Sequence, residues 1–586
     1  MKPLLLTSAR KPWSVIVLLL VVTAIASTQL SALQYHISVE GMMLEDDPAK
    51  QHYEEARTTF GEDDGSILYL HDPDLLLPSK LEAVRGALEV IEELPFVSKT
   101  VSLFTVANLQ NQDDEISTKP FLASIPQTEE ARERLRVQAL NNPMVSKILL
   151  SENGRSMLVA VHFKREATEQ VGFDSEAVQA INAAIEPLKS EIDTVFQQGS
   201  AVVREAVSTE IRADQRRIIP LSLLLLLVLL ATALKRINGA LIPLATSLLS
   251  VIWTLGLMAA LDVPINVMTS IVPALLVIVG STEDVHMLAT YFQARRDGLD
   301  GAAALTRTSN HISTAVALTF ATTYLSFLSI SLSPIQLLEE FGLVASTGLL
   351  FNFLITSSLV PAWLSLAEGK EKGRKGGADE QQDTLFQRAT LAVFNFSITH
   401  KRRMVFFTIV MIGASIWGAM RIQVDNDPMK FFKSDAPLVQ NMRTINQDMA
   451  GTQTFSILLN AHIVGTFQKL EYLDSILELQ EFLEETGLFD KSLSFANVLV
   501  MINSVMDGLE EPDPTYLPEE DAVVEEYMTL ISHRSVAGYI TKDFSQTRII
   551  VRHSISSSHQ LGEALDLVQA YLDTKLPPGM NAHITG

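Results

Sequence analysis

The sequence predicts an α-helical polytopic membrane protein that carries two α+β extracytoplasmic domains. Three observations predict this class. The chain of 586 residues is 47% hydrophobic and only 19% charged, whereas soluble proteins carry about a quarter charged residues. Seven stretches are apolar and long enough to cross a bilayer, which takes about 20 helical residues. Two long polar regions, 34–217 and 421–586, follow the first and the seventh of these stretches.

We interpret the seven apolar stretches as transmembrane helices. They run over Trp13–Leu33, Ile218–Leu234, Ala240–Leu261, Ile265–Leu288, Ile312–Leu332, Phe341–Leu366 and Met404–Met420. The first stretch also fits a cleavable signal peptide, because Ala24-Ile25-Ala26 has the small residues of a cleavage site.

Basic residues alternate between the loops and predict the orientation. Those on one side are Lys2, Arg10, Lys11, Lys235, Arg236, Arg295, Arg296, Arg307, Lys370, Lys372, Arg374, Lys375, Arg388, Lys401, Arg402 and Arg403. The short loops on the other side, Asp262–Pro264 and Ser333–Glu340, contain neither Lys nor Arg. Because cytoplasmic loops are enriched in Lys and Arg, we expect a cytoplasmic N-terminus and extracytoplasmic polar regions.

Composition excludes several classes of function. The chain has no cysteine, which excludes a disulfide framework, a Cys-ligated zinc and a thiol nucleophile. Its net charge of −23 argues against a nucleic-acid partner. No metal-spaced His pair, Gly-x-Ser-x-Gly or phosphate-binding loop is present, so we expect no cofactor, no metal and no enzymatic activity. The acidic runs Glu45-Asp46-Asp47 and Glu62-Asp63-Asp64 could hold Ca²⁺, but solvated loops are the simpler interpretation.

The two polar regions repeat one another. Ser66-Ile67-Leu68 and Ser456-Ile457-Leu458 each begin a strand–helix–strand pattern, which ends at Gly199 in one region and at Gly586 in the other. Such patterns predict small α+β modules. After Gly199 the first half continues into five spans, so we expect this sequence to lack a corresponding C-terminal part and to hold seven of twelve spans. A natural seven-span protein is the alternative.

These boundaries divide the chain into six parts. They are the N-terminal tail and first span (1–33), the first extracytoplasmic domain (34–217), a five-helix membrane block (218–366), a cytoplasmic linker (367–403), the seventh span (404–420) and the second extracytoplasmic domain (421–586).

Ionisable residues within the fourth span suggest its chemistry. A charge inside a bilayer is costly and usually functional, and this span contains Glu283, Asp284 and His286. Glu283 and His286 share a helix face, whereas Asp284 shares a face with Gly280 and Met287. Low dielectric favours a protonated carboxyl group, and a nearby His can exchange the proton. We therefore predict a proton relay of Glu283, Asp284 and His286.

The alternative is that these residues lie at the cytoplasmic interface in contact with water. Counted from Ile265, Glu283 would lie about 27 Å along the helix, which is close to the thickness of the hydrocarbon core. Small and hydroxyl residues are predicted to support the relay, either by close helix packing or by holding a water wire. These are Gly280, Thr282, Thr319, Thr322 and Thr323.

Two local sequences carry a resemblance to a known family. Asn266–Leu288 reads NVMTSIVPALLVIVGSTEDVHML, and Phe341–Leu366 reads FGLVASTGLLFNFLITSSLVPAWLSL. Together with the order of spans and domains they resemble the resistance-nodulation-division (RND) superfamily, most of all its MMPL-type and predicted RND exporter branch. The block 218–366 also resembles a sterol-sensing domain. Many relatives carry Asp two residues after the span's glycine, where this chain has Thr282.

The resemblance implies an exporter driven by the proton-motive force in a bacterial inner membrane. Its expected partners are the bilayer and a lipid or hydrophobic small-molecule substrate, with a homo-oligomer or a periplasmic partner left open. Two alternatives share the architecture: a lipid- or sterol-sensing protein that does not transport, and a protein-secretion accessory.

Overall fold

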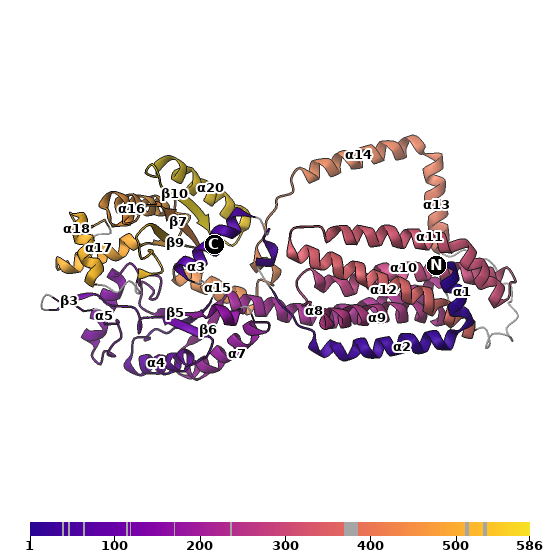
Figure 1. The fold of residues 1–586 in the computed structure, drawn as a ribbon, viewed down its shortest axis with the longest axis horizontal. Coiled ribbons are helices and arrows are strands. Elements are labelled where there is room, and N and C mark those ends of the chain that lie inside the picture. The colour runs from indigo at the N-terminus through magenta and orange to yellow at the C-terminus, as the bar shows by residue number, and fades with distance from the viewer. Residues whose placement is uncertain are drawn as a thin grey trace.

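The computed structural model describes residues 1–37, 40–44, 47–61, 65–112, 115–117, 119–168, 170–234, 237–367, 385–509, 515–530 and 536–586 (Figure 1). Four sets of residues singled out above lie outside these ranges: Glu45–Asp46, Glu62–Asp64, Lys235–Arg236 and the linker charges Lys370–Lys375.

A helical bundle forms one end of the molecule. Within the described residues, seven helices are long and apolar enough to cross a membrane, which confirms the predicted polytopic class. They are α2 (Pro12–Gln29), α8 (Ser200–Leu234), α9 (Ile237–Ala260), α10 (Val272–Arg296), α11 (Gly301–Ile330), α12 (Gln336–Ala367) and α14 (Lys401–Ala419). The shorter helices α1 (Lys2–Arg10) and α13 (Leu385–Thr399) accompany them. Helix α14 stands apart from the others in Figure 1 and has no buried residue.

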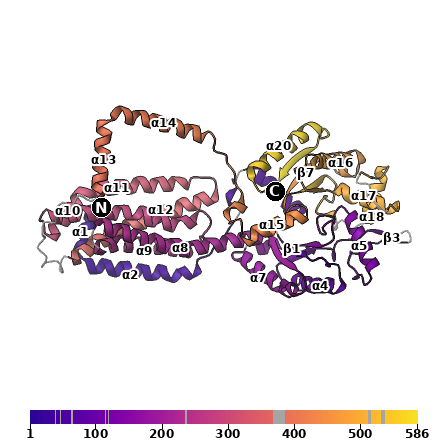
Figure 2. The same cartoon turned by 180° about the vertical axis from the view of Figure 1, so that it is seen from behind.

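Several helices begin at different points from those that hydropathy predicts, and the starts of α10 and α8 matter most for the site and for its connection to the modules. The fourth span was expected from Ile265, but α10 starts at Val272 after a short 3₁₀ turn. Asn266 Oδ1 accepts hydrogen bonds from the backbone N–H of Met268 and Thr269, and this turn holds the preceding residues out of the helix. Helix α8 starts at Ser200, so the second span continues a helix that begins among the strands (Figure 1, Figure 2).

The other end of the molecule holds two α+β modules. Module one contains α3 (Pro48–Phe60), β1 (Gly65–His71), α4 (Pro78–Glu92), β2 (Val97–Val101), β3 (Gln110–Gln112), β4 (Glu115–Ser117), α5 (Glu129–Asn141), β5 (Ser156–Phe163), α6 (Arg165–Thr168), α7 (Phe173–Ile185) and β6 (Thr194–Gly199). Module two contains α15 (Pro437–Asp448), β7 (Gln453–Asn460), α16 (Leu470–Glu485), β8 (Lys491–Leu493), α17 (Phe495–Met506), α18 (Asp521–Leu530), β9 (Gln546–His553), α20 (Ser558–Lys575) and β10 (Asn581–Thr585).

The main sheets of the two modules have the same topology. The strand order is β2-β5-β1-β6 in module one and β8-β9-β7-β10 in module two, with antiparallel neighbours. Each is the sheet of a β-α-β-β-α-β unit. The glycine that ends each repeat occupies the same place: Gly199 and Gly586 both have positive φ, and a Cβ there would lie 2.7 Å and 2.6 Å from neighbouring backbone atoms.

The modules exchange their first helices. Helix α3 belongs in sequence to module one but packs on β10, and its Phe60 joins a small apolar cluster with Leu458 of β7. Helix α15 belongs to module two but packs on β6, where Ile445 is buried beside Tyr69 of module one. Each sheet is therefore covered in part by the other module's helix.

A polar cluster reinforces this exchange. Asp448, at the end of α15, accepts hydrogen bonds from Tyr69 Oη and, at 2.7 Å, from Ser156 Oγ. Burial and the hydrogen bond to Asp448 raise the pKa of Tyr69. His71 Nδ1 lies 2.8 Å from Ser156 Oγ and 3.7 Å from Asp448 Oδ2. The cluster therefore ties the end of α15 to two strands of module one.

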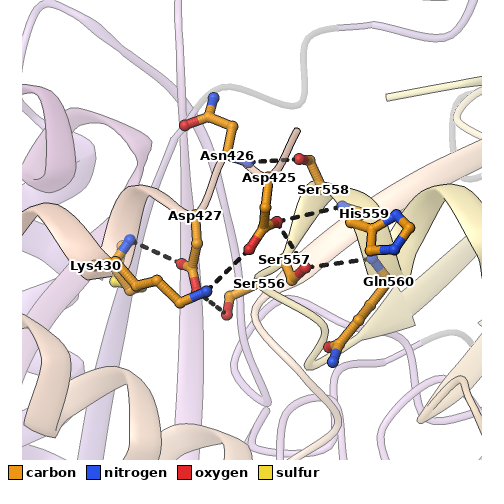
Figure 3. Close-up of polar contacts among 10 residues, drawn as sticks. Asp425, Asn426, Asp427, Lys430, Ser556, Ser557, Ser558, His559 and Gln560 are labelled. Atoms are coloured by element: carbon orange, nitrogen blue, oxygen red, sulfur yellow. Dashed lines mark hydrogen bonds and ion pairs between the residues drawn. The ribbon is translucent and has the colours of Figure 1, made fainter. Parts of the chain in front are cut away.

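The chain that leaves the seventh span is fastened to module two (Figure 3). Asp425 Oδ1 accepts a hydrogen bond from Ser557 Oγ at 2.7 Å, and its other oxygen lies 2.9 Å from Lys430 Nζ. Ser556 Oγ donates to Asp427 Oδ2 at 3.0 Å. These contacts join the segment after α14 to the N-terminus of α20.

The contact between α3 and β10 is expected to weaken in acid. The rings of His52 and His583 stack there with centroids 3.7 Å apart. Burial and the neighbouring His52 lower the pKa of His583, while Glu55 acts in the opposite direction. His583 binds protons more weakly in the docked state than in the unfolded state. The free energy of unfolding is therefore greatest above the ordinary pKa of histidine, near 6.5, and decreases as the pH falls below this value. The protection of β10 amides against exchange, relative to their intrinsic exchange rates, should therefore decrease as the pH is lowered from 7.5 to 5.5.

His583→Phe provides the test because it keeps an aromatic ring but removes the proton. Exchange in β10 of this variant should depend much less on pH, after correction for the intrinsic pH dependence of amide exchange. His559→Phe, at an exposed position on α20, should behave as the wild type does. Equal pH dependence in all three proteins would contradict the role of His583.

Candidate functional site

The centre of α10 carries the acidic residues of the fourth span. Asp284 lies as far along the chain from Val272 as from Arg296, the two ends of the helix, and so lies roughly 18 Å from each. The later start of α10 therefore brings Glu283 and Asp284 to the middle of the helix. A count from Ile265 had placed them near its inner end.

Asp284 is completely buried between α10, α9 and α12. Its side chain is 0% exposed, and Thr246 Oγ1 of α9 donates a hydrogen bond to Oδ2. Thr356 of α12 lies beside the same carboxyl group. Nevertheless, Asp284 Oδ1 and Thr356 Oγ1 each lack a hydrogen-bond partner among the described residues. Thr246 therefore donates a hydrogen bond to the carboxyl group, and Thr356 lies close enough to interact with it.

Two more buried hydroxyl groups, one on α9 and one on α12, have no partner among the described residues. Ser247 and Ser357, the sequence neighbours of Thr246 and Thr356, are fully buried, and neither hydroxyl has a hydrogen-bond partner in the described chain. Native proteins rarely leave buried polar groups unpaired, and an ordered water or a functional role is the usual reason. Thr246 and Thr356 are the hydroxyl residues that lie beside the Asp284 carboxyl group.

An amide forms the next layer of the site. Asn352 of α12 is 2% exposed, accepts a hydrogen bond from Ser250 Oγ at 2.9 Å and donates to the Gly280 carbonyl at 3.1 Å. A Cβ on Gly280 would lie 2.6 Å from Asn352 Cγ, so only glycine lets α10 approach this amide. Asn352 therefore holds α9, α10 and α12 together beside Asp284.

Sequence reasoning did not single out Asn352, Thr246 or Thr356. A signal was available for Asn352, because an amide within the apolar run LLFNFLI is costly in a membrane unless a partner satisfies it. The hydroxyl residues gave no such signal, since Ser and Thr are common in membrane helices as packing residues.

The other predicted relay residues lie elsewhere on α10. Glu283 is partly buried, and its Oε2 has no hydrogen-bond partner among the described residues. His286 and Thr282 are exposed, on a different face from the buried Asp284. The structure therefore places Glu283, but not His286, next to the enclosed carboxyl group.

The predicted hydroxyls of the fifth span also face away from Asp284. Thr319 and Thr322 are exposed and Thr323 is partly buried. Thr322 Oγ1 donates to Leu318 O at 3.1 Å, and Thr323 Oγ1 donates to Thr319 O at 2.9 Å, so both hydroxyls are bound within α11. Any supporting role of these residues lies on the outer face of α11.

Asp284 is an ionisable residue that is fully buried without a nearby opposite charge among the described residues. No ion pair reaches it from any described part of the chain. A buried charge without a partner is strongly unfavourable. A change in its charge would alter the balance of forces among α9, α10 and α12.

The modules contain one cluster that superficially resembles a catalytic triad. Ser156, His71 and Asp448 lie within hydrogen-bond or ion-pair distance. A triad needs the serine and the carboxylate on opposite ring nitrogens of the histidine, whereas here both contacts are to Nδ1. Ser156 is also 0% exposed. The cluster therefore joins the modules and does not present a nucleophile. Among the described residues, no group of three or more His, Asp or Glu could hold a metal ion.

The seven membrane-crossing helices and the two repeated modules agree with a membrane transporter of the RND superfamily. The comparison with family models bears this out: residues 15–397 match the MMPL family, and the chain belongs to that family. It is also similar to a membrane protein of the archaeon Methanocaldococcus jannaschii, with 22% identity over 377 residues. That alignment covers 62% of this chain and 92% of the relative. The resemblance to the RND superfamily and its MMPL-type members, inferred from the sequence, is thereby confirmed.

Proposed function

We propose that this protein exports hydrophobic or lipid-like molecules and is driven by the proton-motive force. The observation that carries the proposal is the fully buried Asp284 carboxyl group in the middle of α10, which is flanked by Thr246 and Thr356 and has no cationic partner among the described residues. Such a group can take up a proton from one side and release it to the other, and the membrane potential supplies about 2.3 kcal/mol per charge per 100 mV.

The packing of the helices suggests how protonation of Asp284 could move module one. Helix α10 contacts both α9 and α8, and α8 continues without a break into module one. Arg204, near the start of α8, pairs with Asp174 of α7 at 2.7 Å. A shift of α10 that follows protonation of Asp284 would thus reach the module through one continuous helix.

The proposed location is a bacterial inner membrane, with both modules in the periplasm. The chain N-terminus lies at the end of the bundle far from the modules (Figure 1). Arg295 and Arg296 at the end of α10 and Arg307 near the start of α11 flank the loop between these helices. The loops at the opposite end of the spans, Asp262–Pro264 and Ser333–Glu340, contain neither Lys nor Arg. Because basic loops stay in the cytoplasm, this distribution supports the orientation. We also propose that the six parts given in the sequence analysis are the domains of this protein.

Reconstitution tests the function directly. Purified protein in vesicles that contain a fluorescent phospholipid analogue should transfer that probe to external albumin several-fold faster when a pH gradient is imposed. A proton ionophore should abolish the difference. Transfer that is independent of both the gradient and the protein would contradict proton-driven export and would favour a sensor that does not transport.

A further inference from the structure

A buried apolar cluster lies beside the polar residues Thr246, Asp284 and Thr356, at the end of the bundle away from the modules. Because α8 leaves the modules and the helices after it alternate in direction, α9 runs toward the modules whereas α10 and α12 run away from them (Figure 1). Four residues, or about one helical turn, separate each polar residue from an apolar side chain that is nearer the far end and at most 2% exposed: Ile242, Leu288 and Val360. All three belong to one buried cluster, which closes this side of the carboxyl group.

The N-terminal helix α1 completes this cluster. Leu5 is 2% exposed and is buried in the same cluster as those three residues, and Met1 and Ala9 are partly buried against it. The other buried members come from α9, α10, α11 and α12. Helix α1 packs on α11 and α12 at the end of the bundle far from the modules (Figure 1). Leu5 therefore closes a cluster whose other buried side chains belong to the spans.

A break in the backbone separates α1 from the first span. Helix α1 ends at Arg10 and α2 begins at Pro12, while Lys11 between them has φ −126° and ψ 58°, outside the helical region. A proline disfavours the helical conformation in the residue before it, so the sequence prevents one continuous helix. The position of this nine-residue helix is therefore set by its packing on α11 and α12 rather than by continuity with α2.

A second apolar cluster lies on the module side of the polar residues. Its buried members include Val251 of α9, Leu276 and Val277 of α10, and Leu349 of α12. The Asp284 carboxyl group is thus enclosed between two apolar clusters, and closely packed apolar constrictions exclude water. The two clusters differ in construction, because the cluster at the far end also depends on a side chain from a short helix that precedes the spans.

We propose that α1 is a gate for the proton site. With Leu5 docked, the far end of the site is closed, and when α1 leaves the bundle, water and protons reach Asp284 from the cytoplasm. The inference rests on the proposed function, because it assigns cytoplasmic access to the same carboxyl group. A carboxyl group that is open to both sides at once would let protons leak, so proton-driven transport needs a closure of this kind.

Thiol labelling of the full chain tests the gate. The protein has no cysteine, so Val360→Cys places a single reporter in the cluster beside Leu5. A charged methanethiosulfonate reagent modifies only a thiol that contacts water, and the rate is followed by mass spectrometry of the intact, detergent-solubilised protein. The reporter should react slowly with native α1 and at least tenfold faster after Leu5→Gln, because a buried amide without a partner is unfavourable and draws α1 out of the cluster.

Leu4→Gln is the matched control. Leu4 precedes Leu5 on α1, is 37% exposed and is not among the residues of the cluster, so this variant should react at the native rate. Leu5→Met, which keeps the volume and the apolar character, should also react slowly. A second reporter, Leu349→Cys in the module-side cluster, should stay slow in every background.

Three results would overturn the proposal: rapid labelling of Val360→Cys beside native Leu5, equal rates with Leu5→Gln and Leu4→Gln, or acceleration of both reporters by Leu5→Gln. Proton flux separates the gate from the proposed function. In vesicles, Leu5→Gln should raise passive proton flux several-fold, and the addition of Asp284→Asn should abolish the rise. The expected labelling rates with an unchanged flux would support closure by α1 and contradict the proposed proton coupling.

Discussion

Asp284→Asn is expected to reduce proton-driven transport by about 100-fold or more while the protein stays folded. Asparagine has the size of aspartate and can still accept the hydrogen bond from Thr246, so the packing of α9, α10 and α12 should survive. It cannot release a proton or become charged, and loss of a proton-transfer group typically costs 10²- to 10⁴-fold in rate. The measurement is proton flux, followed with a dye in the lumen of vesicles under an imposed pH gradient.

Comparison with Glu283 identifies which acid carries the proton. The structure favours Asp284, because it is fully enclosed by three helices whereas Glu283 is only partly buried. Glu283→Gln should therefore lose less activity, and the double variant should resemble Asp284→Asn. Glu339→Gln, the same chemical change at an exposed position on α12, serves as the control. Normal flux in the double variant would rule out a relay through these residues.

Gly451→Ala is expected to prevent module two from folding. A Cβ on this residue would lie 2.1 Å from the backbone oxygen of His553 and 2.7 Å from Asp490 Oδ2. The backbone of β9 cannot move away without breaking its pairing with β7 and β8. Such overpacking costs about 1–3 kcal/mol even where side chains can yield, so a clash with backbone should cost more. The measurements are the yield of folded protein and its apparent unfolding temperature.

Gly562→Ala is the matched control for this substitution. Nothing lies within 4 Å of a Cβ at Gly562, which is inside α20. Alanine is favoured over glycine in a helix by about 0.5–1 kcal/mol, so this variant should unfold at the same or a slightly higher temperature. An unfolding temperature of Gly451→Ala that matches the wild type would contradict the argument.

The sequence was sufficient for features that depend on local pattern. Hydropathy predicted seven membrane-crossing helices, because a span of about 20 apolar residues needs no knowledge of its neighbours. The helical period also distinguished the face of Asp284 and Gly280 from that of His286. The start of α10 could not be predicted in this way, because the turn at Asn266 that delays it depends on side-chain hydrogen bonds and gives no hydropathy signal.

Contacts between distant residues could not be predicted in the same way. The pairing of Asn352 with Gly280 depends on how α12 and α10 pack, and that of Asp448 with Tyr69 joins the two repeats. The internal repeat predicted two similar modules. It gave no indication that α3 and α15 would each cover the opposite sheet, since either pairing satisfies the same apolar patterns.

The exchange of first helices connects each of the two spans that precede a module to the sheet of the other module. Helix α3 follows the first span but rests on the sheet of module two. Helix α15 follows the seventh span but rests on the sheet of module one. A movement of the first span is therefore transmitted through α3 to module two, and a movement of the seventh span is transmitted through α15 to module one. The two modules cannot respond independently, and a displacement that begins in one set of spans is shared between both.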